Sequence, residues 1–277
     1  MKRKSIKLLC SALLVSMVGA SLFGCGSSAE EGGSTTISVS GSTSVGPLME
    51  KIAERYEESN SNISIEINQV GSSAGIKDAI NGVSELGMSS RELKDDEKTE
   101  VTGTTIAYDG IAIITNKNNP IKNITLEQIK DIYTGKITNW KDIDGGKDSP
   151  IVVICREEGS GTRDAFQEII GYASEELIEE AMISNANGAV KETVAGNENA
   201  VGFVSFEYLD DKINVVNVEG ITPEADKVKS GEYKISRPFL VVTKEGSLSE
   251  EGQKLIDYIL SEEGQNIVRE NKLITVE

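Results

Sequence analysis

From Thr36 onward, short runs rich in β-branched residues alternate with segments whose apolar residues recur at helical spacing. This alternation is typical of α/β domains, in which helices pack on a largely parallel sheet. A hydrophobic fraction of 38% and a charged fraction of 26% fit a folded chain rather than a disordered one. With 277 residues, the chain is long enough for one or two domains with a sizeable core.

Three predicted strand-to-helix junctions share one composition, glycine together with hydroxyl residues. They are residues 41–44 (GSTS), residues 71–75 (GSSAG) and residues 159–162 (GSGT). The first backbone N–H groups of a helix have no partner within it, and the positive end of the helix dipole lies there. One such junction is an ordinary helix cap, but three in one α/β chain predict an anion site built from converging helix ends. Arg156, four residues before Ser160, adds one full positive charge.

Several other chemistries are excluded. The chain has no His, which removes Ser-His-Asp and Cys-His catalysis and His-ligated metals. Residues 158–163 (EGSGTR) lack the spacing and the Lys of a nucleotide P-loop. A formal net charge of −17 excludes nucleic acid as a partner, although it does not set the potential inside a dry cleft. We therefore expect a small anion as ligand, with no metal and no cofactor.

The N-terminus reads as a targeting segment. Residues 1–7 (MKRKSIK) are basic, an apolar run spans residues 8–23, and the run ends in Leu22-Phe23-Gly24-Cys25. This ending resembles a bacterial lipobox, so we predict a signal peptide at 1–24, lipidation of Cys25 and a flexible tether at 25–35. An uncleaved membrane anchor is the alternative. Both place the folded part outside the cytoplasmic membrane.

Six segments together resemble the PstS-type phosphate-binding lipoproteins of bacterial phosphate ABC importers. The resemblance runs from about residue 37 to residue 276. Its segments are residues 40–45 (SGSTSV), 71–77 (GSSAGIK), 87–91 (GMSSR), 126–140 (LEQIKDIYTGKITNW), 156–163 (REEGSGTR) and 260–265 (LSEEGQ). The segments at 126–140 and 156–163 are the most specific of these.

The resemblance implies the type II periplasmic-binding-protein fold, in which two α/β lobes are joined by two hinge crossings and close on a ligand. Lobe one would comprise residues 36–107 and 238–277, and lobe two residues 108–237. The crossings would fall near residues 107–110 and 236–238. The first two junctions would then lie on lobe one and the third on lobe two, and a further Gly-containing helix start at 185–191 would face the same cleft.

The resemblance also implies a set of phosphate ligands. The expected ligands are Thr43, Ser44, Ser72, Ser90, Arg91, Asp109, Arg156, Ser160, Gly161 and Thr162. Many members of the family carry an Asp at the position of Ser90, where it accepts the proton of HPO4(2−) and rejects sulfate. We expect Asp109, or else Glu157, to supply that acceptor here.

The function that the resemblance implies is a monomeric, lipid-anchored receptor on the outer face of the cytoplasmic membrane. It would bind inorganic phosphate and deliver it to the permease subunits and cytoplasmic ATPase of an ABC importer. A receptor for sulfate or molybdate, and an adhesin or sensor on the same fold, stay open as alternatives. An enzyme with Ser160 as nucleophile is disfavoured, because no His base and no Lys partner accompany that serine.

Overall fold

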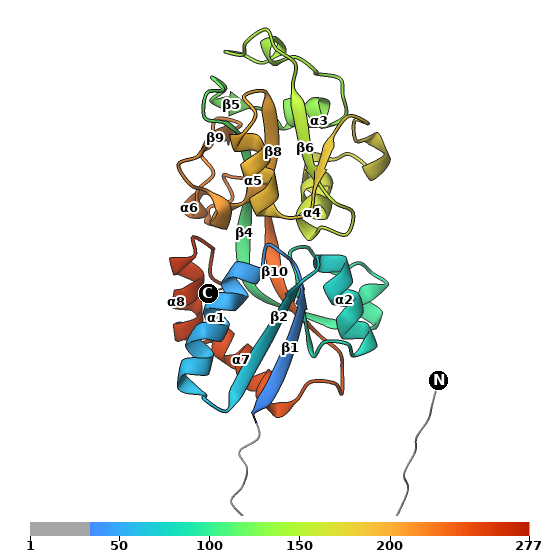
Figure 1. The fold of residues 1–277 in the computed structure, drawn as a ribbon, viewed down its shortest axis with the longest axis vertical. Coiled ribbons are helices and arrows are strands. Elements are labelled where there is room, and N and C mark those ends of the chain that lie inside the picture. Colours follow the sequence, from blue (N-terminus) through green and yellow to red (C-terminus); the bar gives the residue numbers. More distant parts are fainter. Residues whose placement is uncertain (1–33, 277) are drawn as a thin grey trace, which may run out of the picture. The chain divides into compact units, whose positions relative to one another are not determined.

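The computed structural model describes residues 34–276, and Figure 1 shows their fold. The predicted signal peptide, the lipidation site Cys25 and nearly all of the predicted tether lie outside the described residues. Within the described residues, no helix combines the length and the apolar character needed to cross a membrane.

The strands of the described chain follow the predicted alternation with helices. They are β1 Thr35–Gly41, β2 Ile63–Gln69, β3 Leu86–Ser89, β4 Thr102–Asn116, β5 Asn123–Ile124, β6 Val152–Arg156, β7 Met182–Ser184, β8 Ala200–Ser205, β9 Ile213–Val218 and β10 Ser236–Thr243. The main path through the sheet runs β2-β1-β3-β10-β4-β8-β6-β7. Strands β1, β2 and β3 pair in parallel, as do β6, β7 and β8, whereas β4 and β10 are antiparallel to their neighbours.

Eight α-helices occur in the described part of the chain. They are α1 Gly46–Ser59, α2 Ser72–Asn81, α3 Leu126–Tyr133, α4 Gly161–Ile170, α5 Asn187–Ala195, α6 Ala225–Lys229, α7 Glu250–Leu260 and α8 Glu262–Glu270. Short 3-10 turns are η1 Glu97–Thr99, η2 Trp140–Asp142, η3 Ser174–Glu176 and η4 Phe206–Tyr208. Helix α1 shows why they form: Leu48, Ile52 and Tyr56 recur at helical spacing and are all buried.

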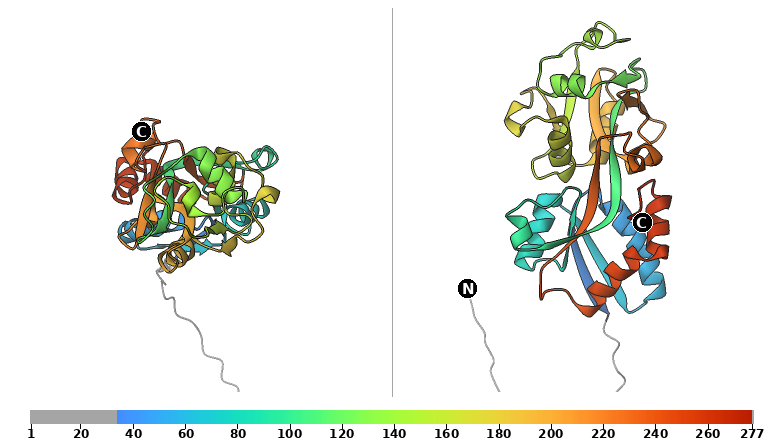
Figure 2. Two further views of the ribbon diagram at one scale, coloured as in Figure 1. Left: turned by 90° about the horizontal axis from the view of Figure 1, so that it is seen from above. Right: turned by 180° about the vertical axis from the view of Figure 1, so that it is seen from behind.

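Two large hydrophobic cores lie on either side of the middle of β4. One is built from residues 37–107 and 239–273, and the other from residues 111–235. In the second core, the rings of Phe166 and Phe203 stack with their centroids 4.0 Å apart. Strands β4 and β10 run side by side from one half to the other (Figures 1 and 2). The predicted fold class, two α/β lobes joined by two crossings, is confirmed.

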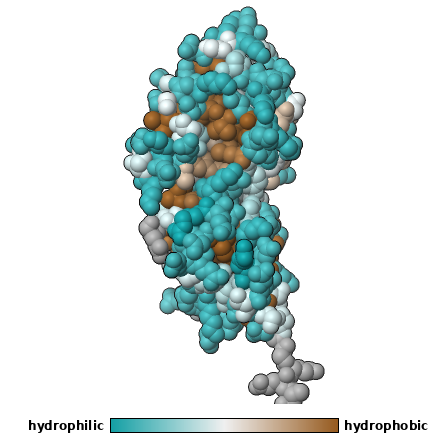
Figure 3. Space-filling model, turned by 90° about the vertical axis from the view of Figure 1, so that its left-hand side faces the viewer, coloured by the Kyte–Doolittle hydropathy of each residue, from teal (hydrophilic) through white to brown (hydrophobic). Residues whose placement is uncertain are grey.

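The molecular surface is mostly hydrophilic on the face that Figure 3 shows. Figure 3 shows that hydrophilic residues cover most of the visible face, while apolar residues gather on the half that contains β8 and β9. Some of the buried polar residues, such as Ser44, Thr162 and Arg156, lie where the two halves meet.

Candidate functional site

The three junctions form helix N-termini as predicted. Ser42 Oγ accepts the backbone N–H of Ser44 at 3.1 Å and that of Val45 at 3.3 Å, which fixes the turn that leads into α1. Ser160 is the N-cap of α4, and its hydroxyl accepts the N–H of Arg163 at 3.3 Å. Before α2, Gly71 has a φ of 95°, a value that favours glycine.

The junctions come together across the two halves of the molecule. Ser44 Oγ lies 2.7 Å from Thr162 Oγ1, and the N–H of Ser73 donates to Gly159 O at 3.1 Å. A side chain at Gly161 would overlap the hydroxyl of Ser72, so only glycine allows this approach. The convergence predicted from three similar junctions is therefore present.

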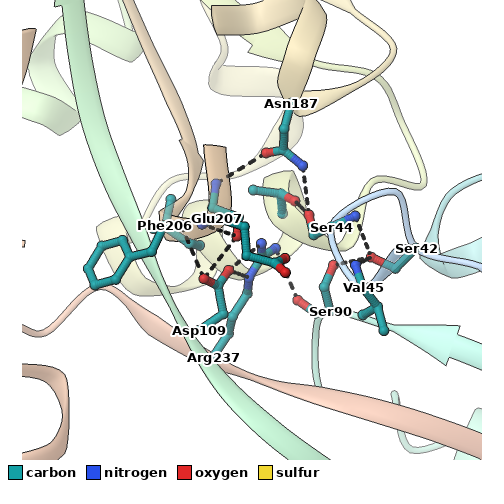
Figure 4. A network of polar contacts seen from close by, with 12 residues as sticks. Ser42, Ser44, Val45, Ser90, Asp109, Asn187, Phe206, Glu207 and Arg237 are labelled. Atoms are coloured by element: carbon teal, nitrogen blue, oxygen red, sulfur yellow. Dashed lines mark hydrogen bonds and ion pairs between the residues drawn. The ribbon is translucent and has the colours of Figure 1, made fainter. Parts of the chain in front are cut away.

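A cluster of buried hydroxyl groups occupies the meeting point, and we call it the hydroxyl cluster. Its members are Ser42, Thr43, Ser44, Ser72, Ser90 and Thr162. Ser42 donates to Ser90 Oγ at 2.9 Å (Figure 4). The Oγ of Ser72 lies 3.3 Å from the same Ser90 atom. Each hydroxyl can rotate to donate to a ligand, so the cluster suits an oxyanion with several acceptor oxygens.

Arg156, at the end of β6, supplies the charge beside the hydroxyl cluster. Its side chain is 1% exposed, and it donates to Thr43 Oγ1 at 3.0 Å and to Thr162 Oγ1 at 3.4 Å. Glu157, which is 24% exposed, accepts two hydrogen bonds of 2.8 Å from the same guanidinium. The structure thus places Arg156 where the sequence predicted it and turns the carboxylate of Glu157 toward that arginine.

Arg91 lies close to the junctions but pairs with carboxylates. It donates to both oxygens of Glu97, at 2.7 and 2.8 Å, and to Ser73 Oγ at 3.1 Å. Its Nε lies 2.9 Å from a carboxylate oxygen of Asp164 on α4. Burial disfavours the charged form, but Glu97 and Asp164 outweigh it and raise the pKa of Arg91.

Asp109 lies on β4 at the crossing, as predicted, and is fully buried. Its Oδ1 accepts the Ser205 hydroxyl at 2.9 Å and the N–H of Phe206 at 3.2 Å. Its Oδ2 accepts Nε and Nη2 of Arg237 on β10 at 3.2 and 2.9 Å. Burial raises the pKa of Asp109, and these donors oppose the rise. Both oxygens are therefore occupied by groups of the protein.

Asn187 and Arg237 contribute to the site without having been singled out in the sequence. Asn187 begins α5, within the segment 185–191 that was expected at the cleft. It donates to Ser44 Oγ at 2.8 Å and accepts the N–H of Ser205 at 3.2 Å. Arg237 donates to Ser90 O at 3.2 Å, which ties the second crossing to the hydroxyl cluster.

Glu207, in η4, is the other residue that the sequence did not mark, since no motif contains it. Both of its carboxylate oxygens are buried, and neither has a hydrogen-bond partner among residues 34–276. Burial holds the pKa of this carboxyl well above its usual range; Asp109 adds to the rise and Arg237 opposes it. Figure 4 shows the side chain directed toward Ser90, alongside Arg237.

Two features of the described residues concern clustered acidic side chains and the cysteine. Over residues 34–276, no group of three or more His, Cys, Asp or Glu side chains is arranged to hold a metal ion. Cys155 is buried, and burial raises the pKa of its thiol to about 11, so it is unreactive. Hydroxyls, helix N-termini and a buried arginine are groups that can bind an anion.

Comparison with known proteins gives one consistent result. The profile of the PBP superfamily domain matches residues 26–263. The phosphate-binding protein PstS of Bacillus subtilis (strain 168) is 31% identical over 243 residues, which is 86% of this chain and 80% of that protein. PstS of Borreliella burgdorferi is 28% identical over 251 residues, 87% of this chain and 90% of that protein.

Solved structures agree with these relatives. One is the X-ray structure, with bound phosphate, of a protein from Clostridium perfringens that is assigned as a phosphate ABC transporter substrate-binding protein. It is 57% identical in sequence, has a TM-score of 0.86, and the match covers 88% of this chain and 100% of that chain. An ABC-type phosphate transport receptor from Vibrio cholerae is 34% identical, has a TM-score of 0.74, and matches 87% of this chain and 100% of its own.

Proposed function

Since the chain belongs to the PBP superfamily and, within it, to the PstS-type phosphate-binding proteins, we propose that it is an extracytoplasmic phosphate receptor that serves an ABC importer. The observation that carries the proposal is the burial of Arg156 against hydroxyls at two helix N-termini, Thr43 before α1 and Thr162 at the start of α4. A small dianion placed there gains one charged partner and several donors. The activity that we propose is capture and release of the anion, with no bond made or broken.

We choose the proposed phosphate ligands by the hydrogen-bond donors and the positive charge that each residue can direct to a ligand. Hydroxyls or backbone N–H groups are offered by Thr43, Ser44, Ser72, Ser90, Ser160, Gly161 and Thr162, and Arg156 offers the charge. Asn187 joins them through the amide that now donates to Ser44 Oγ at 2.8 Å. We assign Arg91 and Asp109 a positioning role instead, because carboxylates surround the first and protein donors occupy both oxygens of the second.

Binding would be coupled to movement of the two lobes about β4 and β10. Contacts that join the halves, such as Ser44 with Thr162 and Arg156 with Thr43, would re-form around the ligand as the cleft closes. A lipid on Cys25 would keep the monomeric receptor near its permease. Both the lipid and the docking are parts of the proposal.

Titration calorimetry of the protein with inorganic phosphate tests this function. We expect a dissociation constant well below about 100 μM, which corresponds to more than about 5 kcal/mol of binding free energy. Nitrate, a planar monoanion of similar size, is the matched ligand control and should bind far more weakly. Phosphate binding no tighter than that of nitrate would refute the proposal.

A second candidate ligand is another tetrahedral oxyanion, such as sulfate. The observation that favours it is Ser90, a hydroxyl that can donate where many relatives carry a carboxylate acceptor. Competition titration of sulfate against phosphate at pH 6 and pH 8 separates the two, since only phosphate changes its protonation over that interval. Sulfate that displaces phosphate at equal concentration would favour the second candidate.

A further inference from the structure

The carboxyl of Glu207 is the buried polar group that the site, as described so far, leaves unexplained. Each of its oxygens is shielded from solvent and lacks a partner among residues 34–276. A buried carboxyl without a hydrogen bond is costly, and native proteins keep such groups mainly where a ligand or function requires them. Its position beside the hydroxyl cluster suggests which ligand that is.

The charged and titratable groups around Glu207 come from several elements. Asp109 on β4 and Arg237 on β10 are the charged groups that affect the pKa of Glu207, and their effects have opposite signs. These two residues already form an ion pair with each other. Tyr208, the next residue, donates its hydroxyl to Thr43 O at 3.0 Å, and burial together with Glu207 raises the pKa of that phenol to about 12. The positive charge of Arg156 opposes this rise in the pKa of Tyr208.

These neighbours leave Glu207 no cation of its own. Arg237 gives two hydrogen bonds to Asp109 and one to Ser90 O. Arg156 gives two to Glu157. An ionised Glu207 would therefore be a second buried carboxylate beside Asp109, whereas a neutral Glu207 carries one O–H donor and one carbonyl acceptor.

Resting on the proposed phosphate-binding function, we propose that Glu207 enters the site as a neutral carboxylic acid and donates its O–H to an oxygen of the bound phosphate. This would give its buried carboxyl the partner that it lacks. It would also add a strong donor beside Ser90 of the hydroxyl cluster. Ionisation of Glu207 would instead set a negative charge against the dianion.

The proposal predicts a specific pH dependence. While Glu207 is protonated, binding needs no proton from solution; once it ionises in the free protein, each binding event must first restore the proton. Phosphate affinity should therefore fall as the pH rises through the titration of this carboxyl. Phosphate itself also titrates, so the informative quantity is the ratio of two proteins measured with the same ligand.

The experiment is calorimetric titration of inorganic phosphate into the unsubstituted protein and the Glu207→Gln variant at pH 6, 7, 8 and 9. Gln keeps a donor and an acceptor but cannot ionise. We expect similar dissociation constants at pH 6 and a value at least about tenfold weaker in the unsubstituted protein at pH 9, equivalent to about 1.4 kcal/mol. Glu179→Gln, which removes an exposed carboxylate before β7, should follow the unsubstituted protein at every pH.

The outcomes separate this proposal from the function on which it rests. A ratio between the two proteins that stays constant from pH 6 to pH 9 overturns the role of Glu207 and leaves phosphate binding intact. Failure of the unsubstituted protein to bind phosphate at any pH overturns both. If the Gln variant does not fold, Glu207→Met replaces it: its affinity is lower throughout, but the same pH-dependent ratio is expected, and a constant ratio is again fatal.

Discussion

Arg156 and Arg237 are both about 1% exposed, yet their surroundings differ. Arg237 pairs with Asp109, which is fully buried, and that carboxylate also receives the Ser205 hydroxyl and the Phe206 N–H. Arg156 pairs with Glu157, which is 24% exposed, and its other hydrogen bonds go to the hydroxyls of Thr43 and Thr162 and to a backbone carbonyl. One arginine is matched by a desolvated carboxylate; the other is matched by a partner that water can also solvate.

The difference fits a structural role for Arg237 and the ligand-binding role that we propose for Arg156. A fully desolvated and saturated pair has no capacity left for a ligand, and it joins β4 to β10 where the chain crosses between the halves. A partly solvated pair leaves positive potential over, and hydroxyl groups can turn from the arginine to an incoming anion. Burial alone would not have told the two arginines apart.

The largest effect on stability is expected when the buried ion pair of Asp109 and Arg237 is broken. Asp109→Ala leaves Arg237 buried without a counter-charge, which costs about 3–5 kcal/mol when one partner of such a pair is lost. Chemical denaturation should show this loss in the free energy of unfolding. Asp211→Ala, at an exposed carboxylate, is the control and should change stability by less than about 0.5 kcal/mol. A loss below about 1 kcal/mol for Asp109→Ala would mean that the pair does not hold the crossings together.

The next effect falls on the other arginine and appears in binding. Arg156→Ala removes the one full charge aimed at the hydroxyl cluster, and we expect phosphate affinity to fall by about 2 kcal/mol or more, roughly 30-fold. Calorimetry measures it, with exposed Arg55→Ala on α1 as the control for total charge. If both variants bind phosphate equally well, Arg156 does not contact the ligand.

Much of this contrast could be predicted from local sequence. The glycine and hydroxyl residues at 41–44, 71–75 and 159–162 specify helix N-termini through short-range geometry. Their convergence was predictable for a different reason, because three junctions of the same composition occur in one α/β chain. Arg156 was also found, because it precedes its junction by four residues. The positions of Arg91 and Asp109 in the chain were predicted near the cleft as well.

What could not be predicted is which partners Arg91 and Asp109 have in the folded protein. Asp109 and Arg237 are 128 residues apart, and their contact depends on the antiparallel register of β4 and β10. The isolation of Glu207 is harder still to foresee, since it is set by which donors every neighbour has already used. Sequence patterns indicate which hydrogen bonds and ion pairs a side chain can form, whereas only the assembled structure shows which of its donors and acceptors are still free.

A third prediction concerns Glu207, whose carboxyl forms no ion pair with Arg237. Because the folded-state pKa of Glu207 is raised, the folded protein holds a proton that the unfolded chain releases above about pH 4.3, so stability falls as the pH rises past that value. Glu207→Gln abolishes this loss. Its melting temperature should equal that of the unsubstituted protein near pH 4 and exceed it by at least about 2 °C at pH 8, the shift produced by roughly 1 kcal/mol. A difference that is the same at both pH values would show that Glu207 is ionised in the fold.

The smallest effect concerns another buried arginine, Arg91, whose partner Asp164 lies on α4 in the other half of the molecule. If Arg91 positions the closed form, as we propose, Asp164→Asn removes an attraction between the halves. Because Asp164 is 26% exposed, the loss in phosphate affinity should be only about 0.2–1 kcal/mol, and it should shrink in 0.5 M salt. If Arg91 binds phosphate directly, the same substitution frees its charge and affinity rises instead. The sign of the change in titration calorimetry therefore decides whether Arg91 belongs with Arg237 or with Arg156.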